Sequence, residues 1–250
     1  MKTWQKLALI VVPALLILGI GIWRIQVARN QPGVVPHAQK EQPLTQDEMV
    51  QPRKLYIDDL KSARELVGKP VWVQAGYEMD YFQYRDRRVE FSHKAGVLPS
   101  VQKLEIRDIV TEKVPAKVQT RVPAGKEQAF AVFTMAGDPK EYATAIGTLQ
   151  ADGWTFYCDN VLYYDDPQQM YKFWPADIWQ AIDQHQPKPG MNELQTAMAL
   201  GVMQQSDSSN YGNRTVYYNA GGKRWSVTFE NDKATQIQQQ PPAPAAGKSA

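Results

Sequence analysis

Few side chains in this sequence have the type and spacing that catalysis requires. The single cysteine, Cys158, is a candidate nucleophile, and such a thiol needs a partner base. The histidines are His37, His93 and His185, and no two of them have the spacing of metal ligands. Pairing of Cys158 with His93 or His185 stays open, although no orienting group and no local signature accompany it. The alternative interpretation of Cys158 is a buried small hydrophobic residue.

Two pairs of neighbouring acids stand out, and the second pair, Asp165 and Asp166, is a candidate for calcium binding or acid–base catalysis. Asp58 and Asp59 lie near a helix start, where negative charge interacts favourably with the helix dipole. Asp165 and Asp166 include the cap of a following helix. The sequence has no phosphate-binding loop, Ser-His-Asp signature or HExxH motif. We therefore predict no enzyme activity, no cofactor and no metal site, with a thiol-dependent enzyme using Cys158 as the less favoured alternative.

One charged segment has the composition of a protein-binding surface. YEMDYFQYRDRRVEF, residues 77–91, mixes tyrosine, phenylalanine and arginine, and such mixtures are typical of interfaces. A solvated hairpin tip is the alternative interpretation. A second candidate is the loop of residues 202–212. The residues predicted to face a partner are Tyr81, Phe82, Tyr84, Arg85, Arg87 and Tyr211.

The elements that must position these residues follow an apolar N-terminal stretch, LALIVVPALLILGIGIW, residues 7–23. Its seventeen uncharged residues reach the lower end of the range for a membrane-spanning helix. The stretch extends to Val27 if Arg24 and Gln26 direct their polar ends to the membrane surface. A cleaved signal peptide is the alternative, but its apolar part would be unusually long. We predict an uncleaved signal anchor in the inner (plasma) membrane, contacting the membrane through residues 7–27, with the C-terminal domains outside the cytoplasm.

The charge of the chain is nearly balanced once this stretch is set aside. The first 29 residues hold four of the 28 basic residues and no acid, which leaves 24 basic against 26 acidic side chains. No basic stripe is present, so we expect no nucleic-acid partner.

Composition divides the chain into five parts. Residues 1–29 form the predicted anchor, 30–54 a flexible linker rich in Gln and Pro, and 239–250 a disordered low-complexity tail. Residues 55–173 are predicted as a β-rich domain, because short apolar runs alternate with Gly and Pro. We expect a small barrel of the SH3-like type with helices at its edges. Residues 174–238 are predicted as a second, α+β domain.

Two details of the β-rich domain are specific enough to check. In VQKLEIRDIV the apolar residues do not keep a strict two-residue period, and a bulge near Asp108 would reconcile them. The segment 138–153 is predicted as a helix, because Asp138 and Pro139 suit its first positions and Tyr142 and Ile146 keep an apolar period.

The second domain begins with a well-capped helix in KPGMNELQTAMALG, residues 188–201. Asn192 is a good N-cap, Gln195 can complete a capping box, and Gly201 can supply the C-terminal cap. NRTVYYN, RWSVTFE and KATQI then alternate apolar and polar residues, which predicts a three-stranded antiparallel meander.

These segments resemble the SmpA/OmlA, or BamE-like, domain family over residues 174–238. The matching positions are Gly190, Met191, Gln195, Gly201, Trp225, Val227 and Phe229. The resemblance implies two helices on a three-stranded sheet, and it implies protein binding rather than catalysis. The best-known member of that family is a non-enzymatic subunit of the outer-membrane β-barrel assembly machinery.

Together these features predict an α+β protein with an N-terminal membrane helix. We expect a membrane-tethered envelope protein that acts as a non-enzymatic protein-binding or assembly module, with a protein partner in the envelope. The alternative is a module that binds cell-wall glycan, indicated by the predicted barrel and by the tyrosine and tryptophan content.

Overall fold

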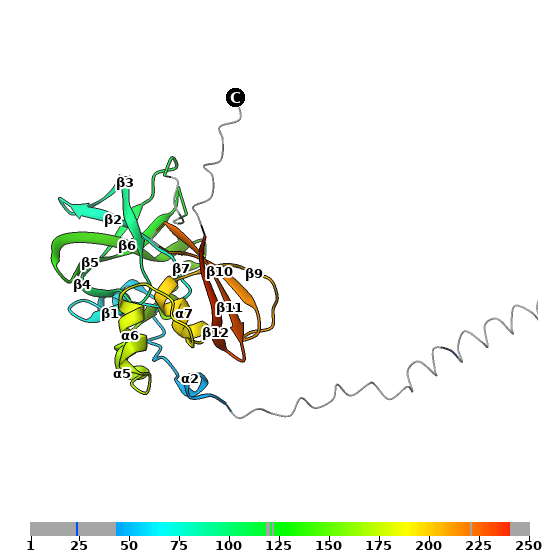
Figure 1. The fold of residues 1–250 in the computed structure, drawn as a ribbon. Helices are drawn as coiled ribbons and strands as arrows, with labels where there is room; N and C mark the ends of the chain where they lie inside the picture. Colours follow the sequence, from blue (N-terminus) through cyan, green and yellow to red (C-terminus); the bar gives the residue numbers. More distant parts are fainter. Residues whose placement is uncertain (1–23, 25–43, 119–120, 122, 221, 241–250) are drawn as a thin grey trace, which may run out of the picture. The chain divides into compact units, whose positions relative to one another are not determined.

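The computed structural model describes residues 24, 44–118, 121, 123–220 and 222–240. The chain divides into two compact units, Met1–Thr45 and Gln46–Ala250, and both β-sheets belong to the second. Two antiparallel sheets dominate that unit, and three of its short helices lie between them in the sequence (Figure 1).

The larger sheet has eight strands in the order β3-β2-β6-β5-β4-β1-β8, with β7 paired to β6. Its strands are β1 (Pro70–Val73), β2 (Met79–Arg85), β3 (Arg88–Leu98), β4 (Lys103–Lys113), β5 (Glu127–Met135), β6 (Asp138–Gln150), β7 (Gly153–Phe156) and β8 (Leu162–Tyr163). The predicted bulge is confirmed, because the pairing of β4 with β5 shifts register between Ile106 and Asp108.

This sheet curls around a core of its own. The backbone N–H of Val89 in β3 donates to a carboxylate oxygen of Glu112 in β4 at 2.8 Å, although three strands separate β3 from β4. The cluster beneath the curl draws side chains from β2 to β6: Phe82, Val89, Val110, Phe130, Val132, Ala143 and Ala145. Main-chain pairing among the described residues does not close the sheet into a barrel. The predicted small SH3-like barrel is therefore wrong, and an open, curved sheet of eight strands stands in its place.

The predicted helix over 138–153 is wrong, because this segment forms β6. The Asp138 carboxylate accepts the N–H of Lys140 and the hydroxyl of Tyr142, so the expected cap instead shapes the hairpin that follows β5. Tyr142 and Ile146 are four residues apart, a spacing that suits one face of a helix and equally one face of a strand. Residues 142–148 are buried on both faces, so no strict alternation of apolar and polar residues marked the strand.

The smaller sheet has four strands in the order β12-β11-β10-β9. These are β9 (Met203–Ser206), β10 (Thr215–Ala220), β11 (Lys223–Glu230) and β12 (Lys233–Gln240), and they appear in orange and red in Figure 1. The three predicted strands of the meander are confirmed as β10, β11 and β12. Asn231 with φ +50° and Asp232 with φ +56° join the last two, and positive φ at both residues is what a type I′ hairpin turn requires.

Six short helices accompany the sheets in the described part of unit two. They are α2 (Gln46–Met49), α3 (Leu60–Arg64), α4 (Cys158–Val161), α5 (Pro167–Met170), α6 (Ala176–Asp183) and α7 (Glu193–Leu200). The predicted capping box of α7 is confirmed, with Asn192 accepting from the N–H of Gln195 and the Gln195 side chain accepting from the N–H of Asn192. Helices α6 and α7 pack with the smaller sheet around a shared core that includes Ile182, Met198, Val227 and Phe229.

Residues 46–54, assigned from composition to a flexible linker, pack on this unit. Asp47 accepts the indole N–H of Trp174 at 2.7 Å and also accepts from the side chain of Asn192. The Arg53 guanidinium forms a bidentate ion pair with the Asp165 carboxylate. These contacts hold the segment against the region of the two longest helices.

The predicted fold class needs correction. The described chain is dominated by strands in two sheets, and its longest helices, α6 and α7, have eight residues each. Among the described residues no helix is long and apolar enough to span a membrane, which contradicts the predicted transmembrane signal anchor and the plasma-membrane location. The segment on which those predictions rested, residues 7–27, lies outside the described residues apart from Arg24.

A candidate binding cleft between the two sheets

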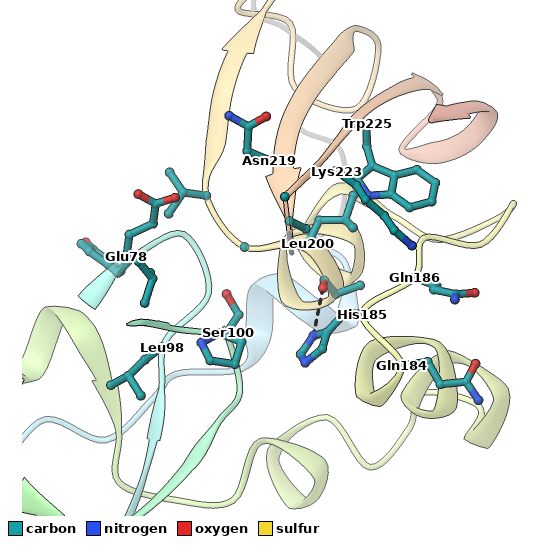
Figure 2. Close-up of a pocket in the computed structure, with 18 residues that line it drawn as sticks. Glu78, Leu98, Ser100, Gln184, His185, Gln186, Leu200, Asn219, Lys223 and Trp225 are labelled. Atoms are coloured by element: carbon teal, nitrogen blue, oxygen red, sulfur yellow. Dashed lines mark hydrogen bonds between the residues drawn. The ribbon is translucent and has the colours of Figure 1, made fainter. Parts of the chain in front are cut away.

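A cleft of about 620 Å³ lies between the end of β3 and the turn region of the β10–β11 hairpin. This volume falls within the range of roughly 300 to 1,000 Å³ typical of ligand pockets. We call it the inter-sheet cleft. Figure 2 shows that its walls come from separate parts of the chain, with Leu98 and Ser100 on one side and Gln186 and Trp225 on the other.

The first wall is the β3–β4 turn, and its geometry is fixed by β1. Val101 has φ +64°, a left-handed conformation that is rare for a β-branched residue. It is held there because its N–H donates to Val73 at 2.8 Å, while the N–H of Val73 donates to Gln102 at 3.0 Å. Such strain persists only where the surroundings over-determine the backbone, and it is frequent at functional sites.

The second wall is formed by the C-terminal ends of α6 and α7. Helix α6 ends in a Schellman motif: His185 donates its N–H to Ile182, and Gln186 donates to Ala181, both at 3.0 Å. Glycine normally occupies the left-handed position of this motif, but here His185 does, with φ +52°. The ring Nδ1 of His185 lies 3.3 Å from the carbonyl oxygen of Ala199 in α7, drawn as the dashed line in Figure 2.

The two walls meet where Gly201 approaches Ser100. Gly201 follows α7 with φ +88°, and a Cβ placed on it would lie 3.7 Å from the hydroxyl oxygen of Ser100. Ser100 is only 4% exposed, and its hydroxyl has no hydrogen-bond partner among the described residues. Ser100, two residues after β3, therefore lies beside Gly201, the residue that follows α7.

The charges around the first wall are paired away from the cleft. Glu78, which lines it, forms an ion pair with Arg121. The neighbouring Asp80 side chain is fully buried and accepts from Arg121 at 2.7 Å and from Lys94 at 3.3 Å. The other charged side chain of the lining is the exposed Lys223 of β11. The neutral polar groups include the side-chain amides of Gln184, Gln186 and Asn219. The cleft thus suits a ligand that offers both donors and acceptors, and Lys223 adds a positively charged donor on the side of the smaller sheet.

Apolar side chains line the rest of the cleft and extend onto its rim. Leu98 and Leu200 are buried, whereas Tyr77 is 43% and Val97 37% exposed. Trp225 is half-buried beside them. Exposed aromatic and aliphatic groups around a concavity are typical of sites that bind another molecule.

The six residues predicted to face a partner differ in exposure, because neighbouring residues of strand β2 point to opposite faces of the sheet. Phe82 is fully buried, and half-buried Tyr81 packs edge-on to Tyr142 with ring centroids 5.1 Å apart. Tyr84 is also half-buried, while Arg85 and Arg87 are exposed at the β2–β3 turn. The sixth member, Tyr211, is 57% exposed in another loop beneath the guanidinium of Arg214, so the six residues do not form one surface.

The residues of the family motif have mainly structural positions. Gly190 has φ +86°, Met191 is buried, and Val227 and Phe229 lie in the core of the smaller sheet. Only Gly201 and Trp225 of this set line the inter-sheet cleft. No sequence motif pointed to the other wall, which consists of the last two residues of β3, Val97 and Leu98, and of Pro99 and Ser100 after it.

The candidate catalytic groups lie elsewhere. Cys158 is 1% exposed within the core of the larger sheet, where burial raises the pKa of its thiol to about 12. Its sulfur contacts the carbonyl oxygen of Ile146 at 3.6 Å, and His93 is exposed on β3. Asp59 and Asp166 cap α3 and α5. No group of three or more His, Cys, Asp or Glu side chains among the described residues is placed to hold a metal ion.

The comparisons with known proteins add no relative. No protein-family model, no curated protein and no solved structure matches this chain. The SmpA/OmlA resemblance of residues 174–238 therefore stays a prediction.

Proposed function

We propose that this chain is a non-enzymatic protein-binding module and that the inter-sheet cleft is its binding site. The observation that carries the proposal is the combination of an interior lined by side-chain amides with an exposed apolar rim, formed by Tyr77 and Val97. A polypeptide segment offers the matching chemistry, because its backbone groups both donate and accept and its side chains supply apolar surface. The predicted SmpA/OmlA resemblance implies the same general role.

The rigidity of the walls supports binding of a partner without large rearrangement. The left-handed Val101 is tied to β1, and His185 joins the ends of α6 and α7. A preformed site loses less conformational freedom on binding than a flexible loop does. The predicted Arg85–Arg87 tip lacks such support, because it is an exposed two-residue turn with Asp86 and Arg87 at positive φ.

Affinity capture with a matched pair of variants tests the proposal. Val97 on the rim is 37% exposed and Val67 outside the cleft is 41% exposed, so Val97→Glu and Val67→Glu place the same charge at equally accessible valines. The full chain and each variant would be used as bait, and retained proteins would be quantified by mass spectrometry. We expect Val67→Glu to retain the partners of the parent chain and Val97→Glu to lose them. Equal retention by both variants would contradict the proposal.

Glycan binding is the competing function, because Trp225 beside neutral amides also offers a stacking face and hydrogen bonds to a sugar. Sedimentation with purified peptidoglycan separates the two functions. Pelleting of the parent chain and of Val67→Glu, but not of Val97→Glu, would assign the cleft to a glycan and overturn protein binding there.

A further inference from the structure

The end of β3 that enters the inter-sheet cleft is an unpaired strand edge. β3 is the terminal strand of the larger sheet and pairs only with β2 among the described residues. Its eleven residues make it far longer than β8, the two-residue strand at the opposite end. An unpaired edge presents a row of backbone N–H and C=O groups to any extended segment that approaches it.

The first part of β3 is protected in ways that edge strands commonly are. Arg88, Glu90 and Lys94 carry charges along it, and Lys94 is held by the buried Asp80. The N–H of Val89 is already occupied by Glu112. Charged side chains and occupied backbone groups discourage pairing with another strand.

The last part, residues 95–98 with the sequence AGVL, has no charge. The pairing of β2 with β3 shifts register here, so that Tyr81 faces Gly96 while Phe82 faces Lys94. The Tyr81 ring lies against Gly96 on one face, where a Cβ would come within 2.8 Å of it. Pairing with β2 continues through Val97 and Leu98, whose side chains line the cleft. The apolar side chains Leu200 and Trp225 lie across the cleft from this edge.

We propose that a partner protein binds by adding an extended segment to residues 95–98 of β3. The segment is uncharged where it crosses Val97 and Leu98, and it places one apolar side chain in the cleft between Leu98 and Leu200. Main-chain hydrogen bonds to the edge supply affinity, and the cleft selects the side chain, as in other β-augmentation complexes. This inference rests on the proposed protein-binding function and names the class of ligand that the cleft takes.

Peptide selection supplies a ligand for the test. A phage-displayed library of random twelve-residue peptides would be selected on the folded full chain and counter-selected on Val97→Glu. Unfolding midpoints of Val97→Glu and Val67→Glu would be compared first, so that a lost fold is not mistaken for a lost site. We expect peptides with an apolar residue in an uncharged stretch, binding Val67→Glu as tightly as the parent chain. A selection that yields no peptide dependent on Val97 would overturn the inference.

Backbone methylation then distinguishes strand addition from other modes of binding. In an added strand alternate N–H groups point to β3, so N-methylation there should weaken binding at least tenfold, while methylation at the intervening residues has a much smaller effect. Hydrogen exchange of the full chain should show new protection within residues 95–98 on peptide addition. Uniform sensitivity, or none, would overturn strand addition. Protein binding in the cleft would still stand if affinity capture depends on Val97.

Discussion

The imidazole Nδ1 of His185 and the carbonyl oxygen of Ala199 lie 3.3 Å apart, which joins the C-terminal ends of α6 and α7 on one wall of the inter-sheet cleft. The bond satisfies one of the final carbonyl groups of α7, which have no partner within the helix. His185 makes it from a left-handed backbone that glycine would adopt without strain.

Two substitutions of His185 separate the effect of the hydrogen bond to Ala199 from the cost of the left-handed backbone. His185→Ala loses the bond to Ala199 and keeps the unfavourable backbone, so we expect the free energy of unfolding to fall by about 1 kcal/mol. His185→Gly also loses the bond but relieves the backbone, so its stability should stay within about 0.5 kcal/mol of the parent chain. Urea unfolding of the three proteins measures both differences. Equal losses in the two variants would show that the left-handed conformation carries no cost.

The ion pair of Glu193 with Arg214 should be the most sensitive charged contact of the smaller sheet. The two side chains are only 5% and 13% exposed, and Glu193 also accepts the N–H of Gly212. Arg214→Met leaves the carboxylate buried without its cation, so we expect a loss of about 3 to 5 kcal/mol in unfolding free energy.

A matched surface pair provides the control for this variant. Arg85 lies 4.0 Å from Glu90, and these side chains are 64% and 39% exposed. Arg85→Ala should therefore change stability by less than about 1 kcal/mol. Comparable losses from Arg214→Met and Arg85→Ala would contradict the assignment of Glu193 and Arg214 as a buried structural pair.

The carboxyl group of Asp232 makes the free energy of unfolding depend on pH. Burial raises the pKa of its carboxyl group above the ordinary value of 3.8, partly offset by the N–H of Glu193 that it accepts. A raised folded-state pKa contributes stability that is present below 3.8 and lost as pH rises through the folded pKa. Asp232→Asn removes the charge, keeps an acceptor oxygen and tolerates the left-handed φ of +56°.

We therefore expect Asp232→Asn to be more stable than the parent chain at pH 7. The difference should shrink as pH falls toward 3.8, where the aspartic acid becomes neutral as well. Urea unfolding of both proteins between pH 3 and 7 measures it. A difference that stays constant or grows on acidification would show that desolvation of the carboxylate is not the cause.

The thiol of Cys158 should be unreactive in the folded protein. With a pKa of about 12, its thiolate fraction at pH 8 is on the order of a thousandfold below that of an ordinary thiol, before any effect of burial. Alkylation by iodoacetamide would be compared with that of a Cys158→Ala/Ser92→Cys variant, whose new thiol is on exposed β3. Rapid alkylation of native Cys158 would revive the thiol-enzyme alternative.

Local signals in the sequence identified some elements and misled about others. The capping box of α7 and the apolar alternation of β10 and β11 are short-range features, and both formed as expected. β6 was missed because a strand buried on both faces shows no alternation, while Asp138 and Pro139 imitate a helix start. The α+β class failed because it extended one segment's resemblance to a chain dominated by strands.

The candidate site could not be predicted because its walls meet only in the fold. Residues 97–100 at the end of β3 meet Gly201 and Trp225 only in the folded chain. Gly201 and Trp225 belong to the family motif, but no motif marks residues 97–100. The composition of residues 77–91 did resemble an interface. Alternation along β2 nevertheless buried Phe82 and left the arginines at a turn.

Site-specific photo-crosslinking tests the central claim most directly. A benzoylphenylalanine residue would replace Val97 on the cleft rim or, as the control, the equally exposed Val67. The full-length proteins would then be irradiated in extracts of the native cells. Binding in the inter-sheet cleft predicts discrete protein adducts from position 97 that are absent from position 67 and are competed by unlabelled parent chain. Adducts that are the same at both positions, or none at position 97, would contradict it.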